Sequence, residues 1–211
     1  MADAAKRARE GGFIDILSLG LLALGGGIVA AHIVHPNYAK IAALLGRPWT
    51  TDIVASAWKW SRKRGVPFAW VLATIIVESG ADPHSAGDAG GKSKGLMQVN
   101  VLAHAADLMK AGYVPNDMYK IDPGIEMGTL AMRDIYNKYV LEPSAARPTA
   151  APKDVAMRLA YKGPATVKSA ILRGEDPRAI SWAPEAISRW RAATQRVATA
   201  TGNGPVNLPF V

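Results

Sequence analysis

The chain has 211 residues, of which 49% are hydrophobic and 20% are charged, and it has no cysteine. This length suits one domain with a full core plus an appendage and leaves little room for two catalytic domains. Without cysteine, its stability does not depend on disulfides. The net charge of +8 favours an anionic partner. Because the basic residues are scattered and no nucleic-acid motif is present, we expect no nucleic-acid partner.

The N-terminal part holds the most apolar stretch of the sequence. Residues 1–12 are polar and basic, and residues 13–34 are almost wholly apolar, interrupted by Asp15 and His32. The apolar stretch is close to the ~20 residues that cross a bilayer as a helix. A basic start before an apolar run also resembles a signal peptide, but we expect a retained hydrophobic helix. This helix would contact a membrane, bind other subunits of an assembly, or pack on its own domain.

The rest of the chain divides into three parts. Residues 35–50 are expected to form a turn-rich connector around a short helical stretch, and residues 51–200 the main domain. Residues 201–211 form a tail without clear periodicity. Thr51 is a plausible N-cap for the first helix of the main domain.

Apolar spacing and capping residues predict an all-α main domain. We expect its helices over residues 51–64, 66–79, 95–111, 154–161 and 184–200, with another that Asp122 caps and that runs to about Tyr139. Residues 142–152 hold three prolines and four alanines, which predicts a flexible excursion between core helices. No stretch alternates long enough to make a sheet central to the fold.

Glu78 stands at the end of the apolar segment 66–79. Pro67 suits the first turn of a helix and Gly80 suits the position after its last turn, so Glu78 falls in the last turn. The partial negative charge of the helix end and the apolar neighbours both disfavour an ionised carboxylate there. A glutamate that keeps its proton near neutral pH is what a glycosidase needs as its general acid.

Two further motifs follow Glu78 and Ser79 in the sequence. Residues 95–100 read Gly-Leu-Met-Gln-Val-Asn, and residues 160–164 read Ala-Tyr-Lys-Gly-Pro. With these motifs in order, residues 51–168 resemble the catalytic domain of the soluble-type lytic transglycosylases, relatives of goose-type lysozyme. The resemblance implies an all-α, lysozyme-like domain that cleaves peptidoglycan.

The resemblance also implies a mechanism with one acid–base residue, Glu78. Glu78 would protonate the leaving oxygen of the MurNAc–GlcNAc bond and then accept the proton of the C6 hydroxyl, which attacks the anomeric carbon. The product would be a 1,6-anhydroMurNAc end, and the N-acetyl group of the substrate would replace a second carboxylate. Alternatively, Asp82 or Asp88 could orient a water, which would make the enzyme an inverting, lysozyme-like hydrolase.

Six more residues are expected to bind the substrate through the same resemblance. They are Ser93, Gly95, Met97, Gln98, Asn100 and Tyr161. Gln98 and Asn100 would form amide hydrogen bonds with sugar groups. Met97 would give an apolar contact, unless it packs in the core. Tyr161 would direct its hydroxyl toward Glu78 or the acetamido group, unless it is an ordinary core tyrosine.

Two departures from the family's pattern bear on the carboxylate of Glu78. Members usually have a loop serine that hydrogen-bonds this carboxylate, and here the loop is longer, so that Ser85, Asp88 or Ser93 could fill the role, or none of them. Either the third motif is one residue shorter than the family's, or Lys162 stands where the family has asparagine. Since a lysine beside Glu78 would oppose its role as an acid, we expect Lys162 to point away.

These features predict an enzyme that acts on peptidoglycan glycan strands, packaged in a bacteriophage virion to open the cell wall during genome delivery. The alternatives are a transglycosylase anchored in the bacterial inner membrane and facing the periplasm, or a wall-binding or structural protein without catalysis. Residues 13–34 would contact a membrane or virion subunits. The four histidines show no ligand pattern, so neither a metal nor a cofactor is expected.

Overall fold

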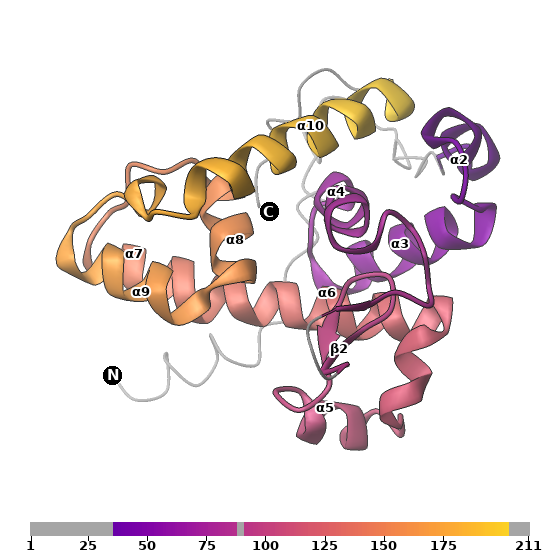
Figure 1. Cartoon of the computed structure of the whole chain (residues 1–211), viewed down its shortest axis with the longest axis horizontal. Helices are drawn as coiled ribbons and strands as arrows, with labels where there is room; N and C mark the ends of the chain where they lie inside the picture. Colours follow the sequence, from indigo (N-terminus) through magenta and orange to yellow (C-terminus); the bar gives the residue numbers. More distant parts are fainter. Residues whose placement is uncertain (1–35, 88–90, 203–211) are drawn as a thin grey trace, which may run out of the picture. The chain divides into compact units, whose positions relative to one another are not determined.

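The computed structural model describes residues 36–87 and 91–202, and this part of the protein is mostly helical (Figure 1). Its α-helices are α2 (Tyr38–Leu45), α3 (Thr51–Arg64), α4 (Phe68–Ser79), α5 (Ala105–Lys110), α6 (Ile121–Tyr136), α7 (Glu142–Ala146), α8 (Lys153–Lys162), α9 (Pro164–Arg173) and α10 (Ala183–Thr201). Other helical turns are the 3₁₀-helices η2 (Pro115–Tyr119) and η4 (Pro177–Ala179) and the π-helix η3 (Asn137–Leu141). The predicted all-α class is confirmed.

The expected hydrophobic helix lies outside the described residues. The predicted helix, residues 13–34, and the basic segment before it, residues 1–12, are both outside. Of the predicted tail, residues 201–211, only the first two positions are described. Within residues 36–87 and 91–202, no helix has the length and apolar character needed to cross a membrane.

Helices α3 and α4 start and stop at residues with the expected capping chemistry. The Thr50 hydroxyl accepts a hydrogen bond from the Ile53 amide at 3.3 Å, so the cap of α3 lies one residue before the predicted Thr51. Gly65 and Gly80, at φ 67° and 62°, end α3 and α4 in the left-handed conformation that glycine adopts at little cost. Helix α4 therefore ends where the sequence predicts.

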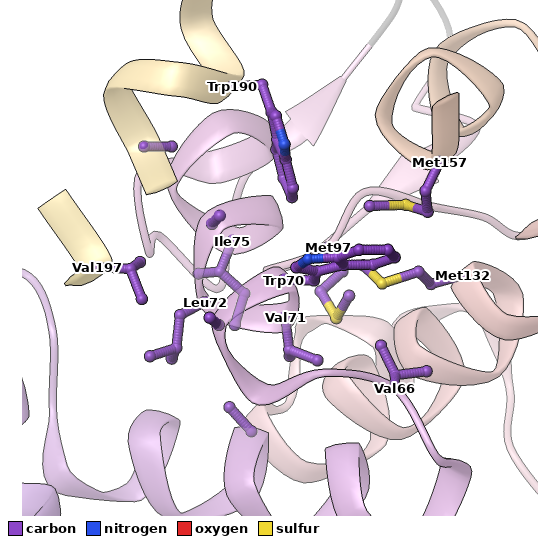
Figure 2. Close-up of a cluster of buried hydrophobic side chains, with 14 of the residues drawn as sticks. Val66, Trp70, Val71, Leu72, Ile75, Met97, Met132, Met157, Trp190 and Val197 are labelled. Atoms are coloured by element: carbon purple, nitrogen blue, oxygen red, sulfur yellow. The ribbon is translucent and has the colours of Figure 1, made fainter. Parts of the chain in front are cut away.

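Helix α4 is the centre of the hydrophobic core. Its residues from Ala69 to Ile75 are all buried, and it packs against both α3 and α10 (Figure 1). Figure 2 shows the Trp70 ring among Met97, Met132 and Met157, with Trp190 of α10 nearby. Full burial of one large apolar side chain stabilises a fold by roughly 1.5–3 kcal/mol. The core therefore fixes the position of α4 and of the residues at its C-terminal end.

The expected connector, residues 35–50, contains helix α2. The Asn37 side chain caps α2 by accepting the Lys40 amide at 2.9 Å. Ile41 and Leu45 are buried in the same core as α4, and α2 packs against α3 and α10. This short helix thus adds to the core.

A turn and the last strand of a small antiparallel sheet replace the first half of the helix expected over residues 95–111. The strands of this sheet, in the order β1-β2-β3, are β1 (Ala86–Gly87), β2 (Ser93–Lys94) and β3 (Val99–Asn100). Gly95 and Gln98 have φ angles of 76° and 50°, which a right-handed helix does not allow. The predicted helix is therefore wrong before α5, which spans Ala105–Lys110.

The segment expected as a flexible excursion, residues 142–152, is helical in its first half. Helix α6 continues through η3 into α7, which covers Glu142–Ala146. Pro143 stands in the first turn of α7, where proline is tolerated, and Ala145 and Ala146 are strong helix formers. Only residues 147–152 form a loop, so the prediction was wrong for the first half.

Asp122 fastens α6 to α3 instead of capping its own helix. Its Oδ1 accepts hydrogen bonds from the Ser56 hydroxyl at 2.7 Å and the Trp60 indole at 2.9 Å, and its Oδ2 accepts from Lys59 at 2.9 Å. Helix α6 begins one residue earlier, at Ile121. The carboxylate that the sequence assigns to a local cap therefore holds two core helices together.

We expect Asp122→Asn to destabilise the protein most at neutral pH. Burial alone would raise the pKa of Asp122, but hydrogen bonds from Lys59, Ser56 and Trp60 outweigh it and hold this pKa below its usual value. A lowered pKa stabilises the fold above the unfolded value near 4, and this contribution is lost as the pH falls through the folded pKa. Because the Asp122 side chain is 46% exposed and water screens its charge, urea unfolding should show a loss of only about 1 kcal/mol at pH 7, which shrinks below about pH 4. A loss that stays constant with pH would contradict this role of the charge.

Candidate active site

A cleft of about 690 Å³ opens beside the C-terminal end of α4. Its walls come from α4, the small sheet, the start of α5, the junction of α6 with η3, α8 with the start of α9, and Arg189 of α10. The residues that line it are Val77, Glu78, Gly87, Ser93, Gln98, Asn100, Ala103, His104, Asp107, Asp134, Ile135, Lys138, Tyr139, Arg158, Tyr161, Lys162, Pro164 and Arg189. The cleft thus joins Glu78 to residues from both predicted motifs.

Glu78 occupies the last turn of α4, as predicted, and its side chain is 20% exposed. The next residue fixes this helix end to the loop that follows. The Ser79 hydroxyl donates to the Leu96 carbonyl at 2.8 Å and accepts a hydrogen bond from the Ala81 amide at 3.2 Å. These bonds hold residues 95–100 next to Glu78.

Arg158 forms an ion pair with Glu78 that sequence reasoning missed. Its Nη1 donates to Oε1 of Glu78, and the arginine side chain is only 6% exposed. The available signal was one charged residue inside the buried run of α8 from Val155 to Ala160. Arg158 also precedes Tyr161 by three residues, which places both on one face of the helix. Neither observation identifies Glu78 as the partner.

Tyr161 lines the cleft, and its hydroxyl donates to the main-chain carbonyl of Met97 at 2.7 Å. Burial and the negative charge of Glu78 raise the pKa of Tyr161, although Arg158 acts in the opposite direction. The hydroxyl therefore keeps its proton at any working pH. Its one proton goes to Met97 in this structure, and its oxygen remains an acceptor.

Met97 lies under the cleft instead of in its wall. Its side chain has no exposed surface and packs with Trp70 and Met132 in the core (Figure 2). A Cβ atom at Gly128 would lie 2.5 Å from the Met97 Cβ, so the glycine lets α6 approach this residue closely. Of the two roles expected for Met97, its position fits packing in the core and not a contact with the sugar.

Gly95 and Gln98 shape the turn before β3. A Cβ atom at Gly95 would lie 1.8 Å from the Met118 carbonyl oxygen, so only glycine fits this approach of two main chains. The Gln98 side-chain amide donates to the carbonyls of Ser85 at 2.9 Å and Gly95 at 3.0 Å. Gln98 thus fastens the turn, and its Oε1 stays without a partner among the described residues.

Ser93 and Asn100 both line the cleft from paired strands. Asn100 Oδ1 accepts the main-chain amides of Leu102 at 3.2 Å and Ala103 at 3.0 Å, which leaves its amide nitrogen without a partner in the described part of the chain. Neither Ser93 nor Ser85 hydrogen-bonds Glu78 there. Asp88, the third residue expected as a possible partner of Glu78, lies outside the described residues.

The other carboxylates that line the cleft have cationic or imidazole partners. Asp107 lies 3.3 Å from Nδ1 of His104, and Asp134 accepts from Arg133 at 2.8 Å. Asp82, a possible water-orienting residue by sequence, is not part of the lining. Its carboxylate accepts a turn amide at 2.9 Å instead. Glu78 is therefore set apart from the other acidic side chains by its contact with a buried arginine.

Lys162 makes no ion pair with Glu78 in the described part of the protein. Its Nζ lies 5.3 Å from the centre of the Trp182 ring, at a distance suited to a cation–π contact. The cation beside Glu78 is instead Arg158, so the setting of this carboxylate is not the purely apolar one expected from its helix. Among residues 36–87 and 91–202, no group of three histidine or acidic side chains could hold a metal ion.

We expect Tyr161→Phe to destabilise the site by leaving the buried Met97 carbonyl without its donor. An unpaired buried acceptor costs about 1–3 kcal/mol, and a domain of this size loses roughly 2–4 °C in Tm per kcal/mol. Differential scanning calorimetry should therefore show a Tm about 2–12 °C lower. Tyr139→Phe is the matched control, because Tyr139 lines the same cleft and its hydroxyl forms no hydrogen bond with the described residues. Equal changes in both variants would contradict the role of the Met97 bond.

The comparisons with known proteins agree with this geometry. The sequence model of the family described as Transglycosylase SLT domain matches residues 56–173, which is more than half of the chain. No curated protein matches the chain. The matched region includes Glu78 and the two motifs at residues 95–100 and 160–164. The chain therefore belongs to the SLT transglycosylase family, whose domain is a lysozyme-like, all-α fold for the lytic-transglycosylase type of peptidoglycan cleavage.

Proposed function

We propose that this protein is a peptidoglycan lytic transglycosylase in which Glu78 serves as both acid and base. The observation that carries the proposal is that Glu78 is the least exposed carboxylate among the described residues that line the cleft. Among the described residues of the lining, the other carboxylates are Asp107 and Asp134, whose side chains are 43% and 46% exposed, against 20% for Glu78. A hydrolase that retains or inverts configuration generally needs two carboxylates on either side of the bond. One largely buried carboxylate beside two more exposed ones favours chemistry with a single acid–base group.

The proposed reaction transfers one proton out of Glu78 and one proton back. Glu78 first gives its proton to the glycosidic oxygen between MurNAc and GlcNAc, and the bond from that oxygen to the anomeric carbon breaks. The substrate acetamido oxygen stabilises the anomeric carbon. The C6 hydroxyl oxygen then bonds to this carbon, and its proton returns to Glu78. The product is a 1,6-anhydroMurNAc end, no water is consumed, and the enzyme is regenerated.

Polar atoms that the protein leaves without partners are suited to bind the sugar. Gln98 Oε1 accepts hydrogen bonds, and the amide nitrogen of Asn100 donates them. Both residues line the cleft together with Ser93. We propose that these three side chains hold the acetamido and hydroxyl groups of the sugars next to Glu78.

Mass spectrometry of the muropeptides released from purified sacculi tests the proposal. The wild-type chain should release products with 1,6-anhydroMurNAc ends. Products with reducing ends alone would instead indicate a hydrolase, with water positioned by another residue of the cleft. If the wild-type chain binds sacculi and releases nothing, it acts as a wall-binding protein without catalysis.

We also propose that the enzyme is carried in a bacteriophage virion and opens the cell wall during genome delivery. The apolar residues 13–34 would contact virion subunits or a membrane, and the net charge of +8 suits anionic wall polymers. Immunodetection in purified virions tests this location. Detection in the inner-membrane fraction of uninfected bacteria would instead support the membrane-anchored alternative.

A further inference from the structure

Arg158 has no other hydrogen-bond partner among the described residues than Glu78. Its side chain is 6% exposed, and its Nε is buried without a partner. Moving a charged group out of water is costly unless several hydrogen bonds replace the lost solvent. A single bond to a carboxylate does not replace them. Arg158 is therefore a costly way to stabilise α8, which points to a role at the carboxylate that it contacts.

A second arginine–glutamate pair shares the buried arginine Nε without a partner, but it differs in exposure and at its carboxylate: the Arg64 side chain is 23% exposed, against 6% for Arg158. Arg64 Nη2 donates to Oε1 of Glu126 at 2.8 Å, and the Tyr113 hydroxyl donates to Oε2 at 2.8 Å. Both oxygens of Glu126 are thus occupied, and neither residue of the pair lines the cleft. Glu78 differs because Arg158 occupies Oε1 alone. Its Oε2 has no partner in the described part of the chain.

We propose that Arg158 is a positioning residue that fixes Oε1 of Glu78 and so reserves Oε2 for both proton transfers. This inference rests on the proposed function. Oε2 carries the proton to the glycosidic oxygen as the bond to the anomeric carbon breaks. The same Oε2 then takes the proton of the C6 hydroxyl as its oxygen bonds to that carbon. Arg158 keeps its charge throughout, because a guanidinium does not lose its proton in proteins.

The second step is where fixing the carboxylate matters most. After the glycosidic bond breaks, the C6 hydroxyl and water compete for the anomeric carbon. The C6 hydroxyl wins if a base already stands within hydrogen-bond reach of it, because an oriented intramolecular reaction has a large entropic advantage. A carboxylate that rotates loses this alignment and can activate water as readily. Arg158 thus acts on the ratio of anhydro ends to reducing ends.

The test measures this ratio and the rate of release from sacculi for variants of the full chain. Arg158→Met removes the charge at similar length, and we expect it to slow release by roughly 100-fold, as for a misalignment of about 1 Å. We also expect a rise in the share of reducing-end products. Arg158→Lys keeps the positive charge and can still donate a hydrogen bond to Oε1, so it should restore most of the anhydro share. Arg64→Met is the matched control, which should lower the Tm and leave the ratio unchanged.

Three outcomes would overturn the inference. They are an unchanged product ratio in Arg158→Met, a ratio in Arg158→Lys as altered as in Arg158→Met, or an equal change in Arg64→Met. If Arg158→Met does not fold, Arg158→Gln replaces it, since it also removes the charge and should shift the ratio the same way. Failure of the proposed function looks different, because wild type itself would then release no anhydro ends.

Discussion

Glu78→Gln should lose nearly all glycan cleavage while it keeps the wild-type fold. The amide has the shape of the carboxyl group and can still accept a hydrogen bond from Arg158, but it can neither give nor take the proton. General acid–base catalysis by one residue contributes about 10²–10⁴-fold, and Glu78 would act in both steps. We therefore expect a loss of roughly 10⁴-fold or more in the rate of muropeptide release.

Two kinds of variant serve as controls for Glu78→Gln. Glu185→Gln changes an exposed glutamate of α10 that is not part of the cleft lining, and it should retain full activity. Asp107→Asn and Asp134→Asn test the other carboxylates of the cleft. A loss as large as that of Glu78→Gln in either one would show that two carboxylates are needed, which contradicts the single-residue mechanism.

Gly95→Ala should destabilise the protein strongly, although it adds only one methyl group. The new Cβ would stand 1.8 Å from the Met118 carbonyl oxygen, and main chain cannot move aside as a flexible side chain does. The residue would also have to keep a φ of 76°, which costs an alanine about 1–2 kcal/mol. Together we expect a loss of roughly 3 kcal/mol or more in the free energy of unfolding, measured in urea. Activity should fall as well, because the turn that leads into β3 would shift.

Gly112→Ala separates the cost of the clash with Met118 from the cost of the positive φ angle. Gly112 has nearly the same φ, 75°, but a Cβ atom there would meet nothing within 4 Å. This variant should therefore lose only about 1–2 kcal/mol, the cost of the backbone conformation. If both variants lose the same amount, the close approach to Met118 does not matter and the account given for Gly95 is wrong.

The sequence was informative wherever local chemistry decides the structure. Pro67 and Gly80 set the ends of α4, so the place of Glu78 in its last turn followed directly. Apolar spacing predicted a helix over residues 184–200, and α10 there buries Ile187, Trp190, Ala193 and Val197. These features depend on neighbours within a turn or two of the helix.

The predictions failed where a distant contact decides the structure. Residues 95–100 have apolar spacing that fits a helix, yet Gly95 packs on the Met118 carbonyl and Gln98 bonds to Ser85. Asp122 looks like a cap, yet its partners lie on α3. Arg158 went unnoticed for the same reason, since helical spacing along α8 says nothing about Glu78.

The distance along the chain between Glu78 and Arg158, 80 positions, affects how activity returns when the protein refolds. Contacts between residues so far apart must wait for a large loop to close, and they form late in proteins rich in such contacts. Helical signal in circular dichroism should therefore recover first, while glycan cleavage should recover only with the slowest folding phase. Enzyme activity then reports the completion of folding, which a measure of helix content alone would miss.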